Sequence, residues 1–259
     1  MAFIADTHVH LYPFFDLTAA LRGALQRLGA LAPGLPRAIF LTERSDCHFF
    51  RDMYERLTAD ASNGASASFE NFQFARAGEN ALVATTGGEK LFIIAGRQIA
   101  TVERLEVHSL AVDVEIPDGL PLADAIARVC DAGGVPVIPW GVGKWLGARG
   151  RLVRDALEKN ADVLAGDSSM RPTPWPEPCF RSAALRVIAG TDPLPVRGEE
   201  QQIGRYATIF DGDLDGCDSA ASVRNALRRV PQSGCKMTGY RCGPIEVFTR
   251  SRAMKNART

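Results

Sequence analysis

The residues with the clearest capacity for chemistry lie at the start of the chain, where an apolar run ends in Asp6-Thr7-His8-Val9-His10. In a β-strand, side chains two positions apart point to the same face, so Asp6, His8 and His10 are predicted to converge. Two imidazoles and a carboxylate are typical ligands of a divalent transition metal. Two of the four histidines in the chain lie here, which favours a metal or catalytic site over unrelated buried histidines.

Composition limits the classes of protein to consider. The chain has 259 residues, of which 46% are hydrophobic, and this is enough for one large α/β domain or for two small domains. Its 30 basic and 30 acidic residues are balanced, so we expect neither a nucleic-acid partner nor an anionic membrane surface. We find no apolar run long enough to span a membrane and no signal peptide. Six scattered cysteines without a Cys-x-x-Cys pair favour a reducing, cytoplasmic location.

Short apolar runs alternate along the chain with segments of helical periodicity. Asp16 is a predicted N-cap for a helix from Leu17 to Leu31, and Gly87-Gly88 predicts a hairpin between two strands. Strands are also predicted at the start and over residues 38–41, 105–112, 135–138, 163–165 and 186–189, and helices over residues 122–129, 151–159, 199–209, 219–230 and 244–259.

Strands that alternate with helices predict a parallel sheet covered by helices, and no linker divides the chain. We therefore expect one domain over residues 1–259, folded as a closed or nearly closed seven-stranded β/α barrel with a short helical C-terminal tail. A doubly wound open sheet is the second possibility. In both folds the functional residues gather at the carboxyl ends of the strands.

Polar residues or glycine turns follow almost every predicted strand. Such loop chemistry is ordinary for one strand, but its repetition on seven strands favours an assembled site. The residues in question are His8, His10, Glu43, Arg44, Gln98, His108, Lys144, Asp167, Arg171 and Asp192.

Several of these stretches, taken in order, resemble the motifs of the PHP (polymerase and histidinol phosphatase) family. The resemblance covers roughly residues 3–210 and is most specific at its two ends. The matching stretches are Asp6-Thr7-His8-Val9-His10, Thr42-Glu43-Arg44, Gly96-Arg97-Gln98, Glu106-Val107-His108, Val135 to Trp140, and Gly190-Thr191-Asp192. The resemblance implies a distorted seven-stranded β/α barrel and up to three metal ions, which activate water and polarise a phosphoester.

The resemblance carries some metal ligands over to this chain and not others. His8, His10 and Asp192 match the first metal position, and His108 matches a ligand of the second. At the other positions this chain differs from the family. Gln98 stands where the family has a bridging glutamate, and Trp140, Arg44 and Leu194 stand where it has histidines. Because two neighbouring metal ions need a bridging anion, we expect at most one ion, with zinc favoured and manganese or iron possible.

The remaining strand-end residues receive predicted roles around that ion. Asp6 is expected to orient one histidine or to be a ligand itself, and Glu43 and Asp167 are candidate general bases. Substrate-binding roles are predicted for Arg44, Gln98, Lys144 and Arg171, because cationic and polar groups suit an anionic ligand.

These predictions favour a metal-dependent hydrolase that acts on a phosphoester or a related anionic small molecule. Two alternatives remain open. The replaced ligands are compatible with a barrel that has lost its chemistry and binds a ligand or partner. An amidohydrolase also opens with His-x-His, although it usually needs further strand-end histidines.

Overall fold

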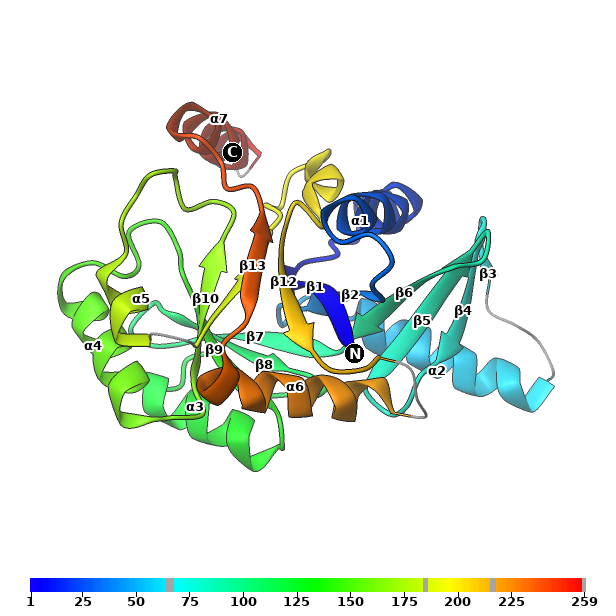
Figure 1. The fold of residues 1–259 in the computed structure, drawn as a ribbon, viewed down its shortest axis with the longest axis horizontal. Coiled ribbons are helices and arrows are strands. Elements are labelled where there is room, and N and C mark those ends of the chain that lie inside the picture. Colours follow the sequence, from blue (N-terminus) through cyan, green and yellow to red (C-terminus); the bar gives the residue numbers. More distant parts are fainter. Residues whose placement is uncertain (64–67, 184–185, 215–217, 258–259) are drawn as a thin grey trace.

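The computed structural model describes residues 1–63, 68–183, 186–214 and 218–257, and these residues form a mixed α/β fold (Figure 1). Within the described ranges, eight strands form one sheet in the order β13-β12-β1-β2-β6-β5-β4-β3, and five form a second in the order β11-β10-β9-β8-β7. The first sheet consists of β1 (Ala2–Val9), β2 (Arg37–Leu41), β3 (Ser68–Phe69), β4 (Phe72–Arg76), β5 (Ala81–Thr86), β6 (Glu89–Ile94), β12 (Tyr206–Asp211) and β13 (Lys236–Gly239). The second consists of β7 (Gly96–Ala100), β8 (Glu106–Leu110), β9 (Val135–Pro139), β10 (Leu164–Ser168) and β11 (Val187–Gly190).

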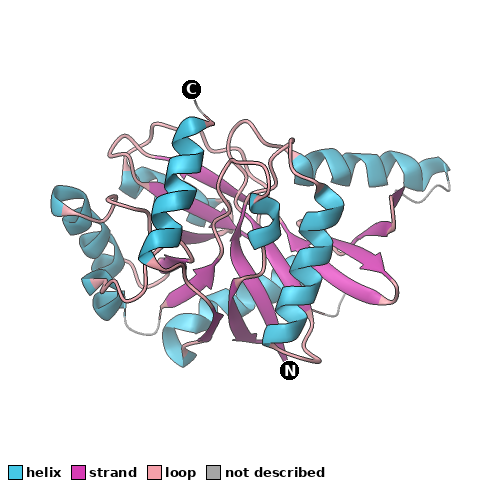
Figure 2. Cartoon of the chain, turned by 90° about the horizontal axis from the view of Figure 1, so that it is seen from above, coloured by secondary structure: helices cyan, strands magenta, loops and turns pink. Residues whose placement is uncertain are grey.

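Helices surround the strands (Figure 2). They are α1 (Leu17–Leu31), α2 (Phe49–Asn63), α3 (Leu122–Asp131), α4 (Gly147–Lys159), α5 (Pro178–Ala183), α6 (Ser219–Ser233) and α7 (Pro244–Asn256). The predicted bounds of α1 are confirmed, and the Asp16 carboxylate accepts a hydrogen bond of 2.9 Å from the amide of Ala19. The hairpin at Gly87-Gly88 is also confirmed, because β5 and β6 pair antiparallel on either side of it.

The prediction of a closed barrel is wrong: the strands form two separate sheets. The physical reason lies at β2, whose outer edge pairs along its length with β6 rather than with the next strand of a barrel. After β6 the chain turns at Ala95 and starts β7 in the second sheet. Only the residue at the end of β2 reaches that strand, through an isolated bridge between Glu43 and Arg97.

Two seams nevertheless hold the sheets together, one between the carboxyl end of β2 and the start of β7, and one at the carboxyl ends of β1 and β11. At the first, the amide of Glu43 donates to Gly96 at 3.0 Å and the amide of Gln98 donates to Glu43 at 2.8 Å. At the second, the amide of Asp192 donates to the carbonyl of His8 at 2.9 Å. The strand ends that carry predicted site residues therefore still meet on one side of the molecule.

The core has an inner layer between the sheets and an outer layer on each side. The inner layer is formed by residues of both sheets, such as Phe40, Phe210 and Ile188, together with the apolar face of α6. The helices α1 and α2 cover the first sheet, and α3 and α4 cover the second. In Figure 1, α6 runs below the strands and α7 lies on the opposite side.

Two further features differ from the predicted elements. The helix predicted over residues 199–209 is a 3-10 helix at Glu199–Gln202 followed by strand β12, because Gly204 adopts a left-handed φ of 84° that ends the helical path. Strand β8 runs antiparallel to both of its neighbours, β7 and β9. The start of β8, rather than its end, therefore lies beside the carboxyl end of β9.

The predicted C-terminal helix is confirmed as α7 through Asn256, and residues 258–259 of that prediction lie outside the described residues. Two ion pairs attach α7 to the rest of the fold. Arg250 pairs with the buried Glu199, with an Nε–Oε1 distance of 2.8 Å, and Arg205 pairs with Glu246, with an Nη2–Oε2 distance of 2.8 Å.

Candidate metal centre

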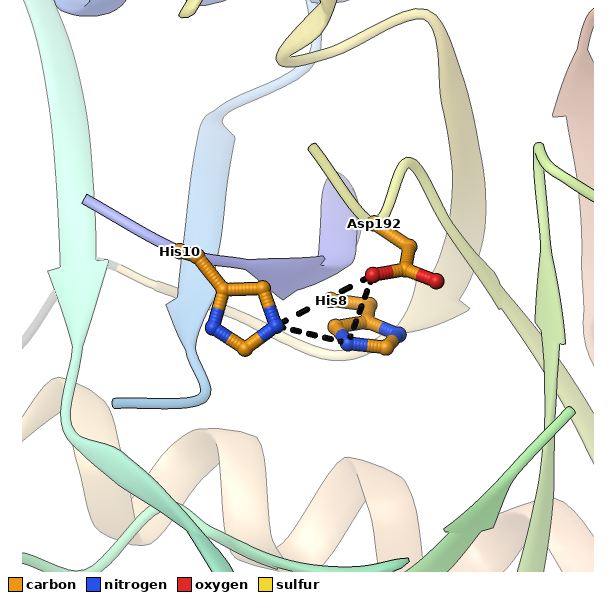
Figure 3. A group of neighbouring side chains, drawn as sticks. All are labelled: His8, His10 and Asp192. Atoms are coloured by element: carbon orange, nitrogen blue, oxygen red, sulfur yellow. Dashed lines mark hydrogen bonds and ion pairs between the residues drawn. The ribbon is translucent and has the colours of Figure 1, made fainter. Parts of the chain in front are cut away.

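His8, His10 and Asp192 lie together at the carboxyl ends of β1 and β11 (Figure 3). The Nε2 atoms of the two histidines are 3.1 Å apart. Oδ1 of Asp192 is 3.4 Å from Nε2 of His8 and 3.9 Å from Nε2 of His10. We call these three residues the metal-ligand group, and they are the residues that the sequence predicted for the first metal position.

A local irregularity in β1 explains why Asp6 does not join this group. The pairing of β1 with β2 shifts between Asp6 and Val9, and such an extra residue interrupts the alternation of side chains. The expectation that Asp6 shares a face with both histidines is therefore wrong. Its buried carboxylate accepts backbone hydrogen bonds of 2.8 Å from Thr191 and from Gly204, and so fixes the segment next to Asp192.

Asp192 is held in an unusual backbone conformation. Its φ of 57° lies in the left-handed region, which a short polar residue adopts at some cost. Its amide donates to His8, and its Oδ2 accepts from the Ser168 hydroxyl at 3.1 Å. The preceding Gly190 is needed for close approach, since a Cβ there would lie 2.4 Å from the amide nitrogen of His8.

The electrostatics of the metal-ligand group favour neutral imidazoles. Burial lowers the pKa of His8 and that of His10 to about 3, because a charged ring loses its hydration there. Burial also raises the pKa of the Asp192 carboxyl, an effect that the neighbouring His10 opposes. Near neutral pH both rings therefore keep a free electron pair, which is the form that binds a metal.

The donor set and its spacing fit one tetrahedral ion. Zinc binds nitrogen and oxygen ligands at about 2.0–2.2 Å, which places tetrahedral ligand atoms about 3.4 Å apart. The three separations of 3.1, 3.4 and 3.9 Å bracket that value. Three protein ligands leave one position open, as in catalytic rather than structural zinc sites.

A cavity of about 400 Å³ opens onto His10 and Asp192, and we call it the site cavity. Its polar lining residues include Arg44, Gln98, Glu106 and Lys144. Its other lining residues include Tyr12, Met170 and Leu194, and two from α7, Ser251 and Met254. The structure therefore brings three of the four predicted substrate-binding residues to the same cavity as the metal-ligand group.

His108 lies deeper than the site cavity and is 1% exposed. Its ring centroid is 4.2 Å from that of His8, and the planes are 73° apart. Among the described residues its Nε2 has no hydrogen-bond partner. Its nitrogens do not belong to the compact group formed by His8, His10 and Asp192.

The structure places the predicted general base Glu43 away from the site cavity, at the start of α2. Its buried carboxylate accepts from the amide of Phe50 at 3.4 Å and lies 3.5 Å from Nη1 of Arg97. Burial raises the pKa of Glu43 to about 7, and Arg97 counteracts part of that rise. These contacts make Glu43 a partner of α2 and of the seam at β7.

The predicted base Asp167 and the predicted substrate-binding residue Arg171 are paired with each other. The guanidinium of Arg171 donates to both carboxylate oxygens, at 2.7 and 2.6 Å. Asp167 also accepts from the Tyr206 hydroxyl at 2.9 Å. Their charged groups thus satisfy one another inside the fold, and neither residue lines the site cavity.

The sequence predictions missed two contributions to the site cavity. Glu106 stands in a stretch that resembles the PHP motifs, but no role was predicted for it, and the reversal of β8 places it on the site cavity. The five residues between β7 and β8 hold too little chain for a parallel crossover, and this is the signal that could have revealed the reversal. No comparable signal marks Ser251 and Met254, whose position depends on how α7 docks.

Comparisons with known proteins concern the fold. Neither a family model nor a curated protein matches this sequence. PsfC from Pseudomonas syringae PB-5123 has a similar crystal structure, with a TM-score of 0.56 and 16% identity over 99% of each chain. Endonuclease Q, seen in complex with a 27-mer duplex containing an abasic lesion, aligns with a TM-score of 0.47 and 13% identity over 91% of this chain. The lesion-specific endonuclease of Pyrococcus furiosus aligns with a TM-score of 0.48 and 12% identity over 92% of this chain. This chain covers 58% of the length of either endonuclease.

One expectation from composition is contradicted by these comparisons. Balanced charge led us to expect no nucleic-acid partner, yet Endonuclease Q, a structural neighbour, is seen with duplex DNA. Net charge averages over the whole surface and says nothing of a local binding face, so the expectation is withdrawn. A separate expectation concerned membranes, and none of the described helices is both long and apolar enough to cross one.

Proposed function

We propose that this chain is a metal-dependent hydrolase of the PHP type, and that it cleaves an anionic phosphoester. The observation that carries the proposal is the metal-ligand group, in which His8, His10 and Asp192 present three donor atoms at tetrahedral spacing beside an open cavity. Arrangements with an unfilled coordination position are those that bind and activate a water molecule.

The proposal includes a single ion, with zinc favoured over manganese or iron. Histidine and carboxylate ligands suit all three metals, and tetrahedral spacing favours zinc. A second ion next to the first needs a bridging anionic ligand. At the position where the PHP resemblance implies that ligand, this chain has the neutral Gln98, whose amide lies 3.4 Å from Oε1 of Glu106.

The residues of the site cavity would have separate roles in the binding and cleavage of a phosphoester. When bound, the ion would supply a water of lowered pKa and would polarise the phosphoryl oxygens. Lys144 and Arg44 would oppose the negative charge of the substrate, and Tyr12, stacked on His10 with ring centroids 5.5 Å apart, would exclude water from one side. Asp6 would keep Asp192 in place through the backbone of Thr191.

A ligand-binding protein without catalysis remains the second candidate, and a specific observation favours it. Trp140 stands where the PHP resemblance implies a metal-binding histidine. Its ring is buried in the outer core, and its Nε1 donates to Glu177 at 3.0 Å. That side chain has become part of the packing, as expected for a position that no longer serves a metal.

Metal analysis and a phosphoester screen test the proposal. Purified protein, stripped with a chelator and then titrated with zinc, manganese and iron, should bind about one equivalent. Turnover of phosphoesters should disappear in His10→Ala and persist in His48→Ala, because His48 lies outside the metal-ligand group. Protein that binds none of the three ions would exclude the hydrolase, and metal binding without turnover would favour the ligand-binding protein without catalysis.

A further inference from the structure

Lys144 and Glu106 form an ion pair among the residues that line the site cavity. The side chains are 31% and 21% exposed, so both charges retain contact with solvent. The amide of Gln98 also donates to Oε1 of Glu106, at 3.4 Å. The ammonium group of Lys144 is thus occupied by a carboxylate of the protein itself.

The backbone around Lys144 is shaped so that its long side chain folds back into the cavity. The amide of Lys144 donates to the carbonyl of Gly141 at 2.9 Å, which closes a turn. A Cβ at Gly141 would lie only 2.7 Å from Cδ of Lys144. The absence of a side chain at Gly141 therefore leaves the path along which the lysine stem reaches Glu106.

The partner carboxylate is placed there by the reversed strand. Because β8 runs antiparallel to β9, its first residue, Glu106, faces the turn that carries Lys144. The site cavity thus holds an anionic group and its cation in contact, and His10 and Asp192 line the same cavity.

We propose that the Glu106 carboxylate is an internal stand-in for the anionic group of the ligand, and that a bound phosphate displaces it from Lys144. This inference deepens the proposed function and rests on it for the identity of the substrate as a phosphoester. Lys144 is then the phosphate-binding cation of the site cavity, and Glu106 is a competitor that sets how tightly the phosphate binds.

Physical chemistry favours such an exchange. A partly exposed pair of single charges contributes little to stability, because solvent screens it. A phosphate carries more charge and more acceptor oxygens than a carboxylate. Arg44 lines the same cavity, but its guanidinium donates to both carboxylate oxygens of Asp46, at 3.1 and 3.2 Å, so Lys144 is the cation better suited to exchange. The flexible side chain of Lys144 can move with the new partner, whereas an arginine that is paired with a carboxylate through two hydrogen bonds would have to break both.

Calorimetric titration of the purified full-length protein with inorganic phosphate tests the exchange. We expect Lys144→Met to weaken phosphate binding about tenfold or more, since a hydrogen bond to a charged group is lost. Glu106→Gln should tighten binding roughly three- to tenfold, because it removes the competing charge. In the double variant, Glu106→Gln should have no effect of its own, as there is no lysine left to compete for.

A matched ion pair elsewhere on the surface provides the control. Lys159 and Asp155 are exposed and 3.9 Å apart on α4, and Lys159→Met and Asp155→Asn should leave phosphate binding unchanged. Thermal melts of all variants check that they fold. The inference is overturned if wild-type protein does not bind phosphate, if Lys144→Met binds it as tightly as wild type, or if Glu106→Gln weakens binding.

The two proposals fail in different ways. If phosphate binding responds to the two variants as expected, but the protein binds no metal and shows no turnover, the exchange at Lys144 is supported and the proposed hydrolase function is overturned. Metal-dependent turnover with phosphate binding that is insensitive to both variants overturns the exchange alone.

Discussion

At the scale of single residues, the metal-ligand group depends most on the charge of Asp192, because both of its histidines are neutral. Asp192→Asn keeps the size of the side chain and removes that charge. We expect zinc affinity to fall about 10- to 100-fold, measured by competition with a chromogenic chelator. Asp211→Asn, at an exposed position, should bind zinc like the wild type. Equal affinity in the Asp192 variant would show that the carboxylate is not a ligand.

The buried carboxyl group of Glu43 leads to a prediction about how the stability of the fold depends on pH. The carboxylate faces Arg97 on β7 and lies near Asp113 and Cys47, and burial raises its pKa to about 7. The folded state then binds more protons than the unfolded state between about pH 4.5 and 7. Stability linked to this group is therefore present at low pH and is lost as the pH rises through that window.

Urea unfolding at pH 5 and pH 8 measures this effect in Glu43→Gln. From pH 5 to pH 8, the free energy of unfolding should fall on the order of 2–3 kcal/mol more in the wild type than in the variant. Other titrating groups contribute equally to both proteins and cancel in the difference. Parallel pH profiles would mean that the carboxyl of Glu43 titrates in its ordinary range.

The sequence predicted the three residues of the metal-ligand group but not every neighbour. His8 and His10 are two apart near the end of a strand, and Asp192 closes a recognisable motif, so local pattern sufficed. Asp6 was misjudged because a single extra residue in β1 interrupts the alternation, and nothing in the residue types marks it. No role was predicted for Glu106, because the direction of β8, which places this residue on the site cavity, is decided by strand pairing.

At the scale of elements, the seam between β11 and β1 holds the metal-ligand group together. Gly190→Ala would place a Cβ 2.4 Å from the His8 amide nitrogen, where neither backbone can yield easily. We expect a loss of about 2 kcal/mol or more in unfolding free energy and weaker zinc binding. Gly243→Ala is the control, since a Cβ there meets nothing within 4 Å. A stable Gly190→Ala protein with normal zinc affinity would show that the seam is not so rigid.

Element types were easier to predict than their arrangement. Periodicity and an N-cap defined α1, and paired glycines defined the β5–β6 hairpin. The segment over residues 199–209 was predicted as helix because its residue types tolerate that structure, whereas Gly204 and the pairing of β12 with β1 decided otherwise. Barrel closure failed for a similar reason, since the competition between β6 and β7 for the edge of β2 is decided by tertiary contacts.

At the scale of the whole molecule, α7 joins the site cavity from the far end of the chain. Arg250 is buried against Glu199, and removal of one partner from such a pair leaves an uncompensated charge. Arg250→Met should loosen α7, so that its amides exchange with deuterium at least about tenfold faster. Arg252→Met, an exposed change on the same helix, should exchange like the wild type. Unchanged protection in Arg250→Met would show that other contacts suffice to dock α7.

The hydrogen bond from Thr191 to Asp6 joins residues 185 positions apart. A contact of such range forms late, because most of the intervening chain must be ordered before its ends can meet. Synthesis delivers the two histidines first and the carboxylate only after most of the protein has emerged. Under the proposed function, a nascent chain would offer a metal ion an incomplete set of ligands until Asp192 has been added, so tight metal binding would report that the two sheets have come together.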